Sequence, residues 1–235
     1  MNPPLCIALW NTEWASLRSK RGHVIRELII AEGPDLVCLT EAAPDLGPDG
    51  GHLLAPGDEP RHRGCKNGEK VLLWSRWPWS RTQTTLPGAV RGRFVEGRTG
   101  PRGDIRVTGV CIPWHDSRTR YGEVRRKRWD DHLEYIDALA AHGARAADGP
   151  SVLLGDYNQR VPRRRQPHRV FERLNRVLEG RALITAGWED PADALIDHVA
   201  LSRGLTGSVT RIWPKVHDGL RLSDHVGVLA EVALP

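Results

Sequence analysis

The chain opens with apolar and amphipathic stretches that predict β-strands and helices in turn. The run LCIALWN (5–11) is short, apolar and β-prone, and it ends in a polar residue. The stretch HVIRELIIAEG (23–33) repeats its apolar residues at helical spacing and stops at a Gly-Pro pair. DLVCLTE (35–41) is a second apolar strand that ends in a carboxylate. A strand, a helix and a strand in this order indicate an α/β protein.

Similar patterns continue to the end of the chain. We expect helices at about 122–142 and 170–178, and strands at 66–76, 104–114, 150–158, 194–202 and 225–234. Residues 88–104 are rich in Gly and Arg, so we expect a surface loop or a hairpin tip there. No linker or internal repeat divides the chain, which predicts a single domain over residues 1–235.

Composition places the chain among globular proteins. Of its 235 residues 40% are hydrophobic, which is enough for a substantial core. The formal net charge of +5 favours a polyanionic partner such as nucleic acid, although an organism that favours arginine would show the same excess. No apolar run approaches the roughly 20 residues that a membrane-spanning helix needs, and LCIALW is too short for a signal peptide. Cys6, Cys38 and Cys111 lie in apolar runs without C-x-x-C spacing, so we expect reduced core cysteines in a cytoplasmic protein.

Polar and charged residues stand at the boundaries of five predicted strands. They are Asn11 with Glu13, Glu41, Asp156 with Asn158, Asp197, and Asp224 with His225. A single Asp at a strand end is more often a turn former or a helix cap than a functional residue. Five such places with the same residue types are better explained by one site, because functional side chains collect at the strand ends of α/β folds.

These residue types suit hydrolysis of a phosphate ester assisted by a hard cation. Mg²⁺ prefers oxygen ligands and usually takes one or two protein carboxylates, which Glu41 with Glu13 or Asp224 would supply. A metal-bound phosphate is a better electrophile, and the metal neutralises charge in the transition state. Neither H-E-x-x-H nor G-x-x-x-x-G-K-[ST] occurs in the sequence, so it gives no support for zinc or for a P-loop.

The remaining strand-end residues have the chemistry to handle the water and the phosphate. Asp156 is a candidate to orient and deprotonate the attacking water, and the Asn158 carboxamide can donate to a phosphate oxygen. A protonated His225 would stabilise the charge that develops on the phosphate. A carboxylate such as Asp197 would fix the tautomer of that imidazole and raise its pKa.

Five motifs occur in an order and spacing typical of one enzyme family. They are WNTEW (10–14), LTE (39–41), LLGDYN (153–158), LIDHVAL (195–201) and LSDHVGV (222–228). Together they resemble the endonuclease/exonuclease/phosphatase family, and VLLWSRWP (71–78) is similar to a strand of that family as well. G-D-x-N alone is a weak signal, whereas G-D-x-N with a downstream D-[HY] strand and a terminal S-D-H is specific. The resemblance implies a four-layer α/β sandwich, with two packed mixed β-sheets flanked by helices.

The resemblance also implies a set of metal-side residues. Asn11 matches a residue that helps to hold metal and phosphate, and Glu41 matches the principal metal ligand. Asp224 matches a metal-side carboxylate next to the catalytic histidine. Glu13 falls where several nucleases of the family carry an Asp.

Four further residues match the catalytic positions of the family. Asp156 matches the carboxylate that activates water, and Asn158 matches the residue that contacts the phosphate. His225 matches the catalytic histidine, and Asp197 matches the carboxylate that is its partner. The resemblance therefore implies hydrolysis without a covalent enzyme intermediate.

One position departs from the family pattern. The strand at 104–114 carries Cys111 where the family usually has a His or Tyr that reaches the phosphate. A thiol is a weak donor, so Trp114 or His115, just beyond it, are the candidates to reach in instead. The departure concerns assistance to the leaving group and the choice of substrate. It does not affect the metal, the water or the imidazole.

Two dense basic runs, 118–128 and 160–169, follow strands that carry site residues. Such runs are usually solvated helix faces or loops, but these two are placed to border one site, with Arg120 and Arg160 as candidate contacts. The phosphates of a nucleic acid would suit these arginines, while Trp114 or Tyr157 would stack on bases. A small anionic substrate would suit the arginines too.

We therefore predict a monomeric phosphodiesterase that depends on Mg²⁺ or Mn²⁺ and hydrolyses the backbone of DNA or RNA by in-line attack of activated water. The first alternative is a phosphatase or phosphodiesterase for a small phosphorylated molecule or a lipid headgroup. Salt dependence separates the two, because nucleic-acid binding weakens steeply with salt. The second alternative is an inactive nucleic-acid-binding module, against which the intact carboxylates argue.

Overall fold

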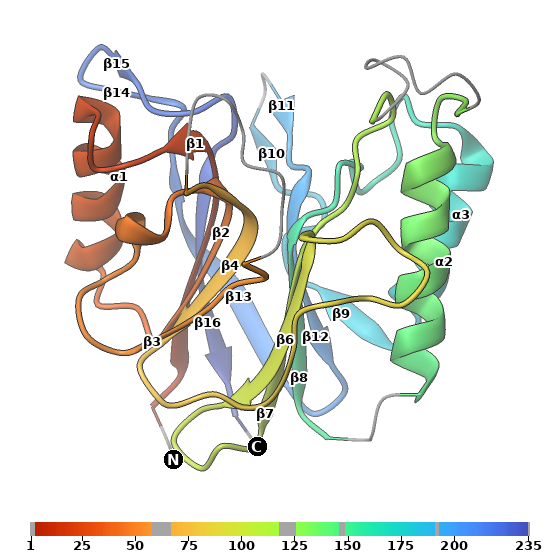
Figure 1. Ribbon diagram of the computed structural model, residues 1–235, viewed down its shortest axis with the longest axis horizontal. Helices are drawn as coiled ribbons and strands as arrows, with labels where there is room; N and C mark the ends of the chain where they lie inside the picture. The colour runs from red at the N-terminus through yellow and green to blue at the C-terminus, as the bar shows by residue number, and fades with distance from the viewer. Residues whose placement is uncertain (1–2, 58–66, 118–125, 146–148, 191–192, 235) are drawn as a thin grey trace.

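Two six-stranded mixed sheets pack face to face in the computed structural model of the protein (Figure 1). The structure describes residues 3–57, 67–117, 126–145, 149–190 and 193–234. Helix α1 (Lys20–Ala31) covers the outer face of the first sheet, whereas α2 (Asp130–Arg145) and α3 (His168–Val177) cover the outer face of the second. The predicted four-layer α/β sandwich is therefore confirmed.

The first sheet contains the first and the last strand of the described chain. Its strands are β1 (Leu5–Ala15), β2 (Leu36–Ala42), β3 (His52–Leu54), β4 (Glu69–Ser75), β13 (Thr206–Trp213) and β16 (Gly227–Ala233). They lie in the order β13-β16-β1-β2-β4-β3. β1 runs parallel to β2 and antiparallel to β16. The end of β1 therefore lies beside the end of β2 and the start of β16, and all three strands carry predicted site residues at or next to these ends.

The second sheet is built from the middle of the chain. Its strands are β5 (Ser80–Gln83), β6 (Phe94–Thr99), β7 (Ile105–Cys111), β8 (Ser151–Asp156), β9 (Arg181–Leu183) and β12 (Asp197–Ser202), in the order β5-β6-β7-β8-β12-β9. β7 and β8 are parallel and are joined through α2, whereas β12 is antiparallel to β8. In this register Asp156 lies opposite both Cys111 and Asp197.

Short elements complete the described chain. They are the 3-10 helix η1 (Pro44–Leu46) and the strand pairs β10 (Glu189–Asp190) with β11 (Asp193–Ala194) and β14 (Val216–His217) with β15 (Leu220–Arg221). The loop expected at 88–104 contains β6 instead, because its alternating buried residues pair along the whole of β7. The helix expected from residue 122 begins at Asp130, and residues 118–125 lie outside the described part of the chain.

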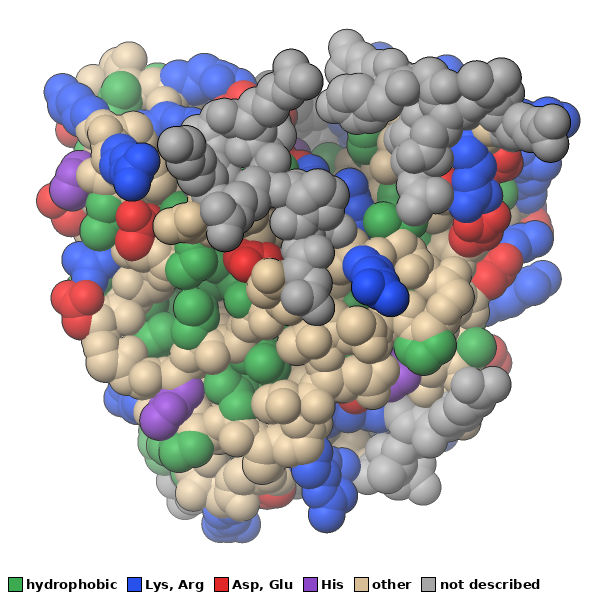
Figure 2. All heavy atoms as spheres, in the orientation of Figure 1, with side chains coloured by type: hydrophobic (Ala, Val, Ile, Leu, Met, Phe, Trp, Pro, Cys, Tyr) green, Lys and Arg blue, Asp and Glu red, His purple; other side chains and the backbone are tan. Residues whose placement is uncertain are grey.

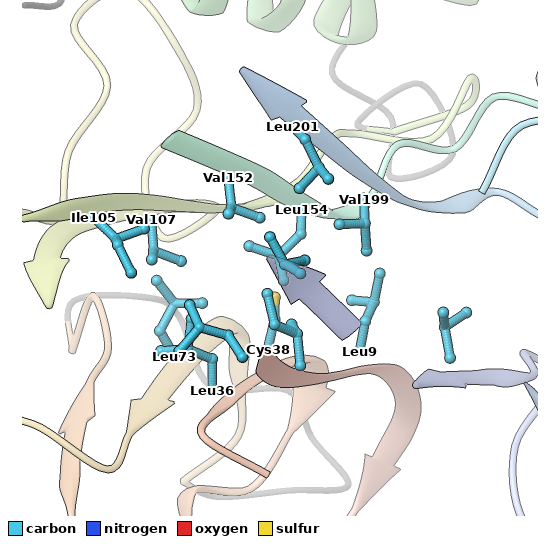
Figure 3. Packing of buried hydrophobic residues seen from close by; sticks show 14 of the residues in the cluster. Leu9, Leu36, Cys38, Leu73, Ile105, Val107, Val152, Leu154, Val199 and Leu201 are labelled. Carbon is cyan, nitrogen blue, oxygen red and sulfur yellow. The ribbon is translucent and has the colours of Figure 1, made fainter. Parts of the chain in front are cut away.

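The core between the sheets follows the two-residue period of the strands. Leu9, Leu36 and Cys38 from the first sheet meet Val107, Val152, Leu154, Val199 and Leu201 from the second (Figure 3). Burying one such side chain contributes about 1.5–3 kcal/mol, so both sheets are fixed up to the last residues of their strands. The site residues stand on this rigid support. Within the described ranges, no helix is long and apolar enough to cross a membrane.

Candidate active site

The site lies where β1, β2 and β8 end and where β12 and the segment before β16 begin, at the upper end of the sheets in Figure 1. Gly155 sets the position of its most buried acid. Its φ of 138° and its contact with β7 leave no room for a side chain, since an added Cβ would lie 1.9 Å from the Val110 carbonyl oxygen. Glycine therefore allows β8 to approach β7 directly before Asp156.

Asp156 is held by three hydrogen bonds in a nearly closed environment, with 3% of the residue exposed. Its Oδ2 accepts from Asn11 Nδ2 and from Asn158 Nδ2, each at 3.1 Å. Its Oδ1 accepts from the Asn158 backbone N–H at 2.8 Å. Asn158 adopts a left-handed φ of 51°, which Asn tolerates better than most residues. The two asparagines thus fix the direction in which the carboxylate faces.

The ionisation of Asp156 is shifted strongly. Burial and the nearby charge of Asp197 raise the pKa of Asp156 to about 7, and Glu41 adds to this, while His225 opposes it. A carboxyl group with this pKa can take up a proton near neutral pH, which an ordinary Asp cannot do.

His225 and Asp197 form a second functional unit beside Asp156. Nδ1 of His225 lies 2.5 Å from Oδ2 of Asp197, and Asp197 is 2% exposed. Burial alone would lower the pKa of His225, but the charge and hydrogen bond of Asp197 outweigh it and raise the pKa to about 10. His225 is therefore an imidazolium at neutral pH. Its Nε2 lies 3.8 Å from Oδ1 of Asp224.

The segment that carries Asp224 and His225 is tied to the end of β1. Ser223 Oγ donates to the Asn11 carbonyl oxygen at 2.6 Å and accepts from the His225 backbone N–H at 3.1 Å. Trp10 Nε1 donates to the His225 carbonyl oxygen at 3.2 Å, and its ring stacks on Trp213 at 5.3 Å. The S-D-H segment and the W-N segment of β1 therefore hold each other in place.

Glu41 forms an ion pair that the sequence did not reveal. Lys70 Nζ lies 2.6 Å from Oε1 of Glu41 and 4.5 Å from the centre of the Trp14 ring. Both partners are partly exposed, with 20% of the Lys70 side chain and 24% of the Glu41 side chain accessible. Lys70 therefore adds a positive charge at the site. It belongs to no motif, and only the pairing of β2 with β4 brings it there.

Glu13 faces two arginines at the outer margin of the site. Arg221 Nη1 lies 2.8 Å and Arg21 Nη1 3.4 Å from Oε2 of Glu13. Arg21 Nη1 also donates to the carbonyl oxygens of Leu222 at 2.7 Å and Thr12 at 3.2 Å. Arg21 thus clamps the end of β1 to the segment before Asp224, and the Glu13 carboxylate supports this clamp.

Cys111 is enclosed at the end of β7. Burial raises the pKa of its thiol to about 12, so it is neither charged nor a strong donor. The guanidinium of Arg93 lies beside it, with Nη1 3.2 Å from the Cys111 carbonyl oxygen and 3.6 Å from its Sγ. Arg93 Nε is buried without a hydrogen-bond partner among the described residues. A strong donor that the sequence did not indicate therefore stands where the expected His or Tyr is missing.

Trp114 and His115 form part of an aromatic group next to the end of β7. The His115 ring lies 5.2 Å from the Trp114 ring and 5.3 Å from the Trp129 ring. His115 Nε2 also lies 2.9 Å from Oδ2 of Asp116. Trp114 and His115 are partly exposed.

The other predicted substrate contacts have different outcomes. Tyr157 is fully buried in the core beneath α2 and α3, and its hydroxyl donates to the Leu153 carbonyl oxygen at 2.9 Å. It cannot stack on a base from there, which corrects that expectation. Arg160 lines a small pocket of about 50 Å³ together with Lys215, Asp197, Asp224 and His225. Arg120 lies outside the described residues.

The oxygen donors around Asp156 fit a divalent metal. One ligand atom each of Asp156, Asp197 and His225 lies within 4.8 Å of the others, but the short bond to Asp197 occupies Nδ1 of His225. Carboxylate and carboxamide oxygens are the ligands that Mg²⁺ prefers. Burial is the main cause of the raised pKa of Asp156, and the charges of Asp197 and Glu41 add to it; a cation beside these carboxylates would favour their ionised form.

The comparison with protein families supports the same conclusion. The chain matches the model described as Endonuclease/Exonuclease/phosphatase family over residues 8–225. The protein therefore belongs to this family, as its motifs predict, and it is an enzyme of the phosphoric ester hydrolase type. A comparison with curated proteins found no match.

Solved structures of several enzymes share the fold. An AP endonuclease from Archaeoglobus fulgidus is 15% identical with a TM-score of 0.68, and the match covers 96% of this chain and 98% of that chain. The 3′-5′ exonuclease NExo from Neisseria meningitidis is 21% identical with a TM-score of 0.66, covering 97% and 99%. A humanized D. rerio TDP2 is 13% identical with a TM-score of 0.66, covering 98% and 99%. At these identities the similarity establishes the fold.

Proposed function

We propose that the protein is a divalent-metal-dependent phosphodiesterase that hydrolyses the backbone of a nucleic acid. One observation carries the proposal: the buried carboxylate of Asp156, oriented by two asparagines, lies next to the His225–Asp197 pair. A proton acceptor and a cationic donor thus stand within a few ångströms of each other, as hydrolysis of a phosphate ester requires.

Asp156 is the proton acceptor in this proposal. Its pKa of about 7 matches a group that takes a proton from water near neutral pH. Asn11 and Asn158 keep its oxygens directed toward the attacking water. The imidazolium of His225 is the donor to a non-bridging phosphate oxygen through Nε2, because Asp197 holds its Nδ1–H.

Glu41, Asn11 and Asp224 would hold the metal, with Mg²⁺ or Mn²⁺ as the hard cations that suit such oxygen donors. When bound, the metal polarises the phosphate and offsets its charge. Lys70, which forms an ion pair with the Glu41 carboxylate, brings a further positive charge to the phosphate. Arg93 supplies the donor that Cys111 lacks.

Two kinds of support favour a nucleic acid as the substrate. Arg160 and Lys215 line the pocket that contains His225, so positive charge borders the catalytic group. Proteins of the same fold are named as an AP endonuclease and a 3′-5′ exonuclease, and one structure is described as the 3′ phosphatase NExo bound to product DNA hairpin.

Cleavage assays test the proposal directly. Plasmid DNA, single-stranded DNA, RNA and a generic phosphodiester would be incubated with the protein in Mg²⁺, Mn²⁺ or EDTA. We expect metal-dependent cleavage of at least one polynucleotide, and a loss of about a hundredfold or more in the Asp156→Asn variant, as removal of a general base produces. The matched control is Asp104→Asn, which alters an exposed acid in the turn before β7.

The panel also separates the alternatives. Cleavage of the generic ester without any polynucleotide would assign a small phosphorylated substrate. Full activity in the Asp156→Asn variant would remove Asp156 from the mechanism. A protein that binds polynucleotides but turns over no ester with either metal would be a binding module.

A further inference from the structure

A second cavity of about 340 Å³ lies between the second sheet and its covering helices, and it shares no residue with the candidate active site. Glu96, Arg106, Thr108 and Leu153 line its sheet side. α2, the end of α3 and the start of β9 line the rest. In Figure 2, basic side chains interleaved with carboxylates gather along the edge formed by α2 and α3. The cavity is therefore a pocket of its own within a charged part of the surface.

Small residues on α2 create this space. Ala140, Gly143 and Ala144 face the cavity, and a Cβ added at Gly143 would have no heavy atom within 4 Å. Leu139 and Leu153, each only 4% exposed, form an apolar floor. The helix approaches the sheet without filling the gap, and the wall at Gly143 is open to a ligand.

The carboxylate of Glu96 is already engaged. Its Oε2 accepts from Thr108 Oγ1 at 2.7 Å and lies 3.1 Å from His142 Nε2. Burial alone would raise the pKa of Glu96, but the hydrogen bonds from His142 and Thr108 lower it below the ordinary value. Glu96 therefore remains an anion that Thr108 and His142 hold in place, and its charge also acts on Arg106 and Arg181.

Three guanidinium groups outnumber the remaining acid of the cavity, Glu179. Arg181 is partly buried, and its Nη1 donates to Ser151 Oγ at 3.2 Å. The guanidinium groups of Arg106 and Arg176 make no ion pair or hydrogen bond within the described part of the chain, although the charge of Arg106 acts on Glu96 and lowers the pKa of that carboxyl. Burial lowers the pKa of Arg181, and the nearby charge of Arg106 lowers it further. Three like charges thus face one cavity whose two carboxylates, Glu96 and Glu179, leave one positive charge in excess.

We propose that this cavity binds a small phosphate-bearing molecule. A guanidinium presents two parallel N–H donors to a phosphate, and Arg106, Arg176 and Arg181 come from three different elements around the cavity. Its volume falls within the range of ordinary small-molecule sites, about 300–1,000 Å³. The apolar floor accommodates an organic group attached to the phosphate, and Glu179 accepts a hydroxyl or amino hydrogen.

Isothermal titration calorimetry of the whole protein in EDTA tests this proposal with three probes: inorganic phosphate, adenosine monophosphate and adenosine. We expect both phosphates to bind, with adenosine at least about tenfold weaker than its monophosphate. Arg106→Gln and Arg176→Gln should each weaken binding about tenfold or more, as loss of a charge-assisted bond does. Arg169→Gln, on an exposed residue two turns earlier in α3, should change nothing.

A filled cavity provides the independent variant. Gly143→Leu places a side chain in the open space, whereas Ala141→Leu adds the same side chain to the exposed face of α2. We expect Gly143→Leu to abolish binding and Ala141→Leu to leave binding unchanged. The thermal unfolding of both variants should stay cooperative. Equal binding of phosphate and adenosine monophosphate would restrict the ligand to the phosphate group and still support the site.

Three results would overturn the proposal. The first is no heat with either phosphate at millimolar concentration. The second is binding that is lost in His225→Gln and retained in both arginine variants, because the ligand would then occupy the active site. The third is a single-stranded oligonucleotide that binds through Arg106 and Arg176 far more tightly than the monophosphate, which would make this face a nucleic-acid surface.

Discussion

Asp197 directs His225: its Oδ2 lies 2.5 Å from the imidazole Nδ1, and only 2% of Asp197 is exposed. The two residues come from different sheets, Asp197 from the start of β12 and His225 from the segment that precedes β16. Packing of the sheets therefore assembles the pair. The pairing leaves Nε2 as the atom that faces a substrate.

We expect Asp197→Asn to lower the pKa of His225 from about 10 to its ordinary value of 6.5 or below. Asp197 supplies the main stabilisation of the imidazolium, and burial acts against it once that charge is removed. NMR titration of the imidazole in the metal-free protein measures the change. Asp224→Asn is the control, because Asp224 is half exposed and lies 3.8 Å away, so it should cause a much smaller shift. A pKa that stays near 10 in Asp197→Asn would show that another group holds the proton.

Lys70→Gln should strengthen metal binding. The substitution removes the cation that lies 2.6 Å from Glu41, so the carboxylate becomes a better ligand. We expect roughly three- to tenfold tighter binding of Mn²⁺ by calorimetry, in keeping with the modest energy of a partly exposed ion pair. KM for a polynucleotide should rise at the same time, since a positive charge next to the phosphate is lost.

Arg76→Gln provides the matched comparison for Lys70. It breaks the ion pair in which Arg76 Nε lies 3.1 Å from Oδ1 of Asp35, on the side of the fold where β2 begins. Its Mn²⁺ affinity should equal that of the unaltered protein. Weaker Mn²⁺ binding in Lys70→Gln would mean that Lys70 positions Glu41 for the metal and does not compete with it.

Gly155→Ala should destabilise the protein through one steric clash. The new Cβ would lie 1.9 Å from the Val110 carbonyl oxygen, at a φ that disfavours a side chain. We expect a loss of about 3 kcal/mol or more in the free energy of unfolding, measured with urea. Gly204→Ala separates the steric clash from the cost of the backbone conformation, because Gly204 has a φ of 87° with open space around it. There only the backbone cost of about 1–2 kcal/mol applies. Equal losses at both positions would argue against the close approach of β8 to β7.

Much of the site could be predicted because it follows strand periodicity. Asp156 is the last residue of β8, a continuous apolar run whose alternation fixes the direction of its side chain. Asn158 lies beyond the strand with a left-handed φ of 51°, and its carboxamide turns back to Asp156. The same alternation explains the error at Tyr157. Between two residues that face the site, its side chain points to the opposite face and fills the core under α2 and α3.

Lys70, Arg93 and Arg21 were missed for a different reason. Each reaches the site through a contact between elements: Lys70 through the pairing of β2 with β4, Arg93 through the pairing of β6 with β7, and Arg21 through α1. Long cationic side chains carry no periodic signal, and most of them are solvated. Only the assembled fold shows which ones turn inward.

His132 makes the stability of the protein sensitive to mild acid. Its Nδ1 lies 2.6 Å from the Pro113 carbonyl oxygen, which can only accept, so Nδ1 carries the hydrogen. Its Nε2 then accepts from Gln159 Nε2 at 2.9 Å. Burial lowers the pKa of His132 from 6.5 to about 4. The fold thus holds the neutral ring, and the unfolded chain binds the proton more readily.

The sign of the pH effect follows from this difference. Above pH 6.5 the ring is neutral in both states and its full contribution is present; as the pH falls from 6.5 to about 4, the unfolded state gains a proton and stability is lost. At pH 5 the loss from His132 is about 2 kcal/mol. Urea unfolding at pH 7 and pH 5 should therefore show a decrease that is about 2 kcal/mol smaller in His132→Gln than in the unaltered protein. Replacing the exposed His23 of α1 should leave the decrease unchanged, and an equal decrease in all three proteins would contradict a buried neutral His132.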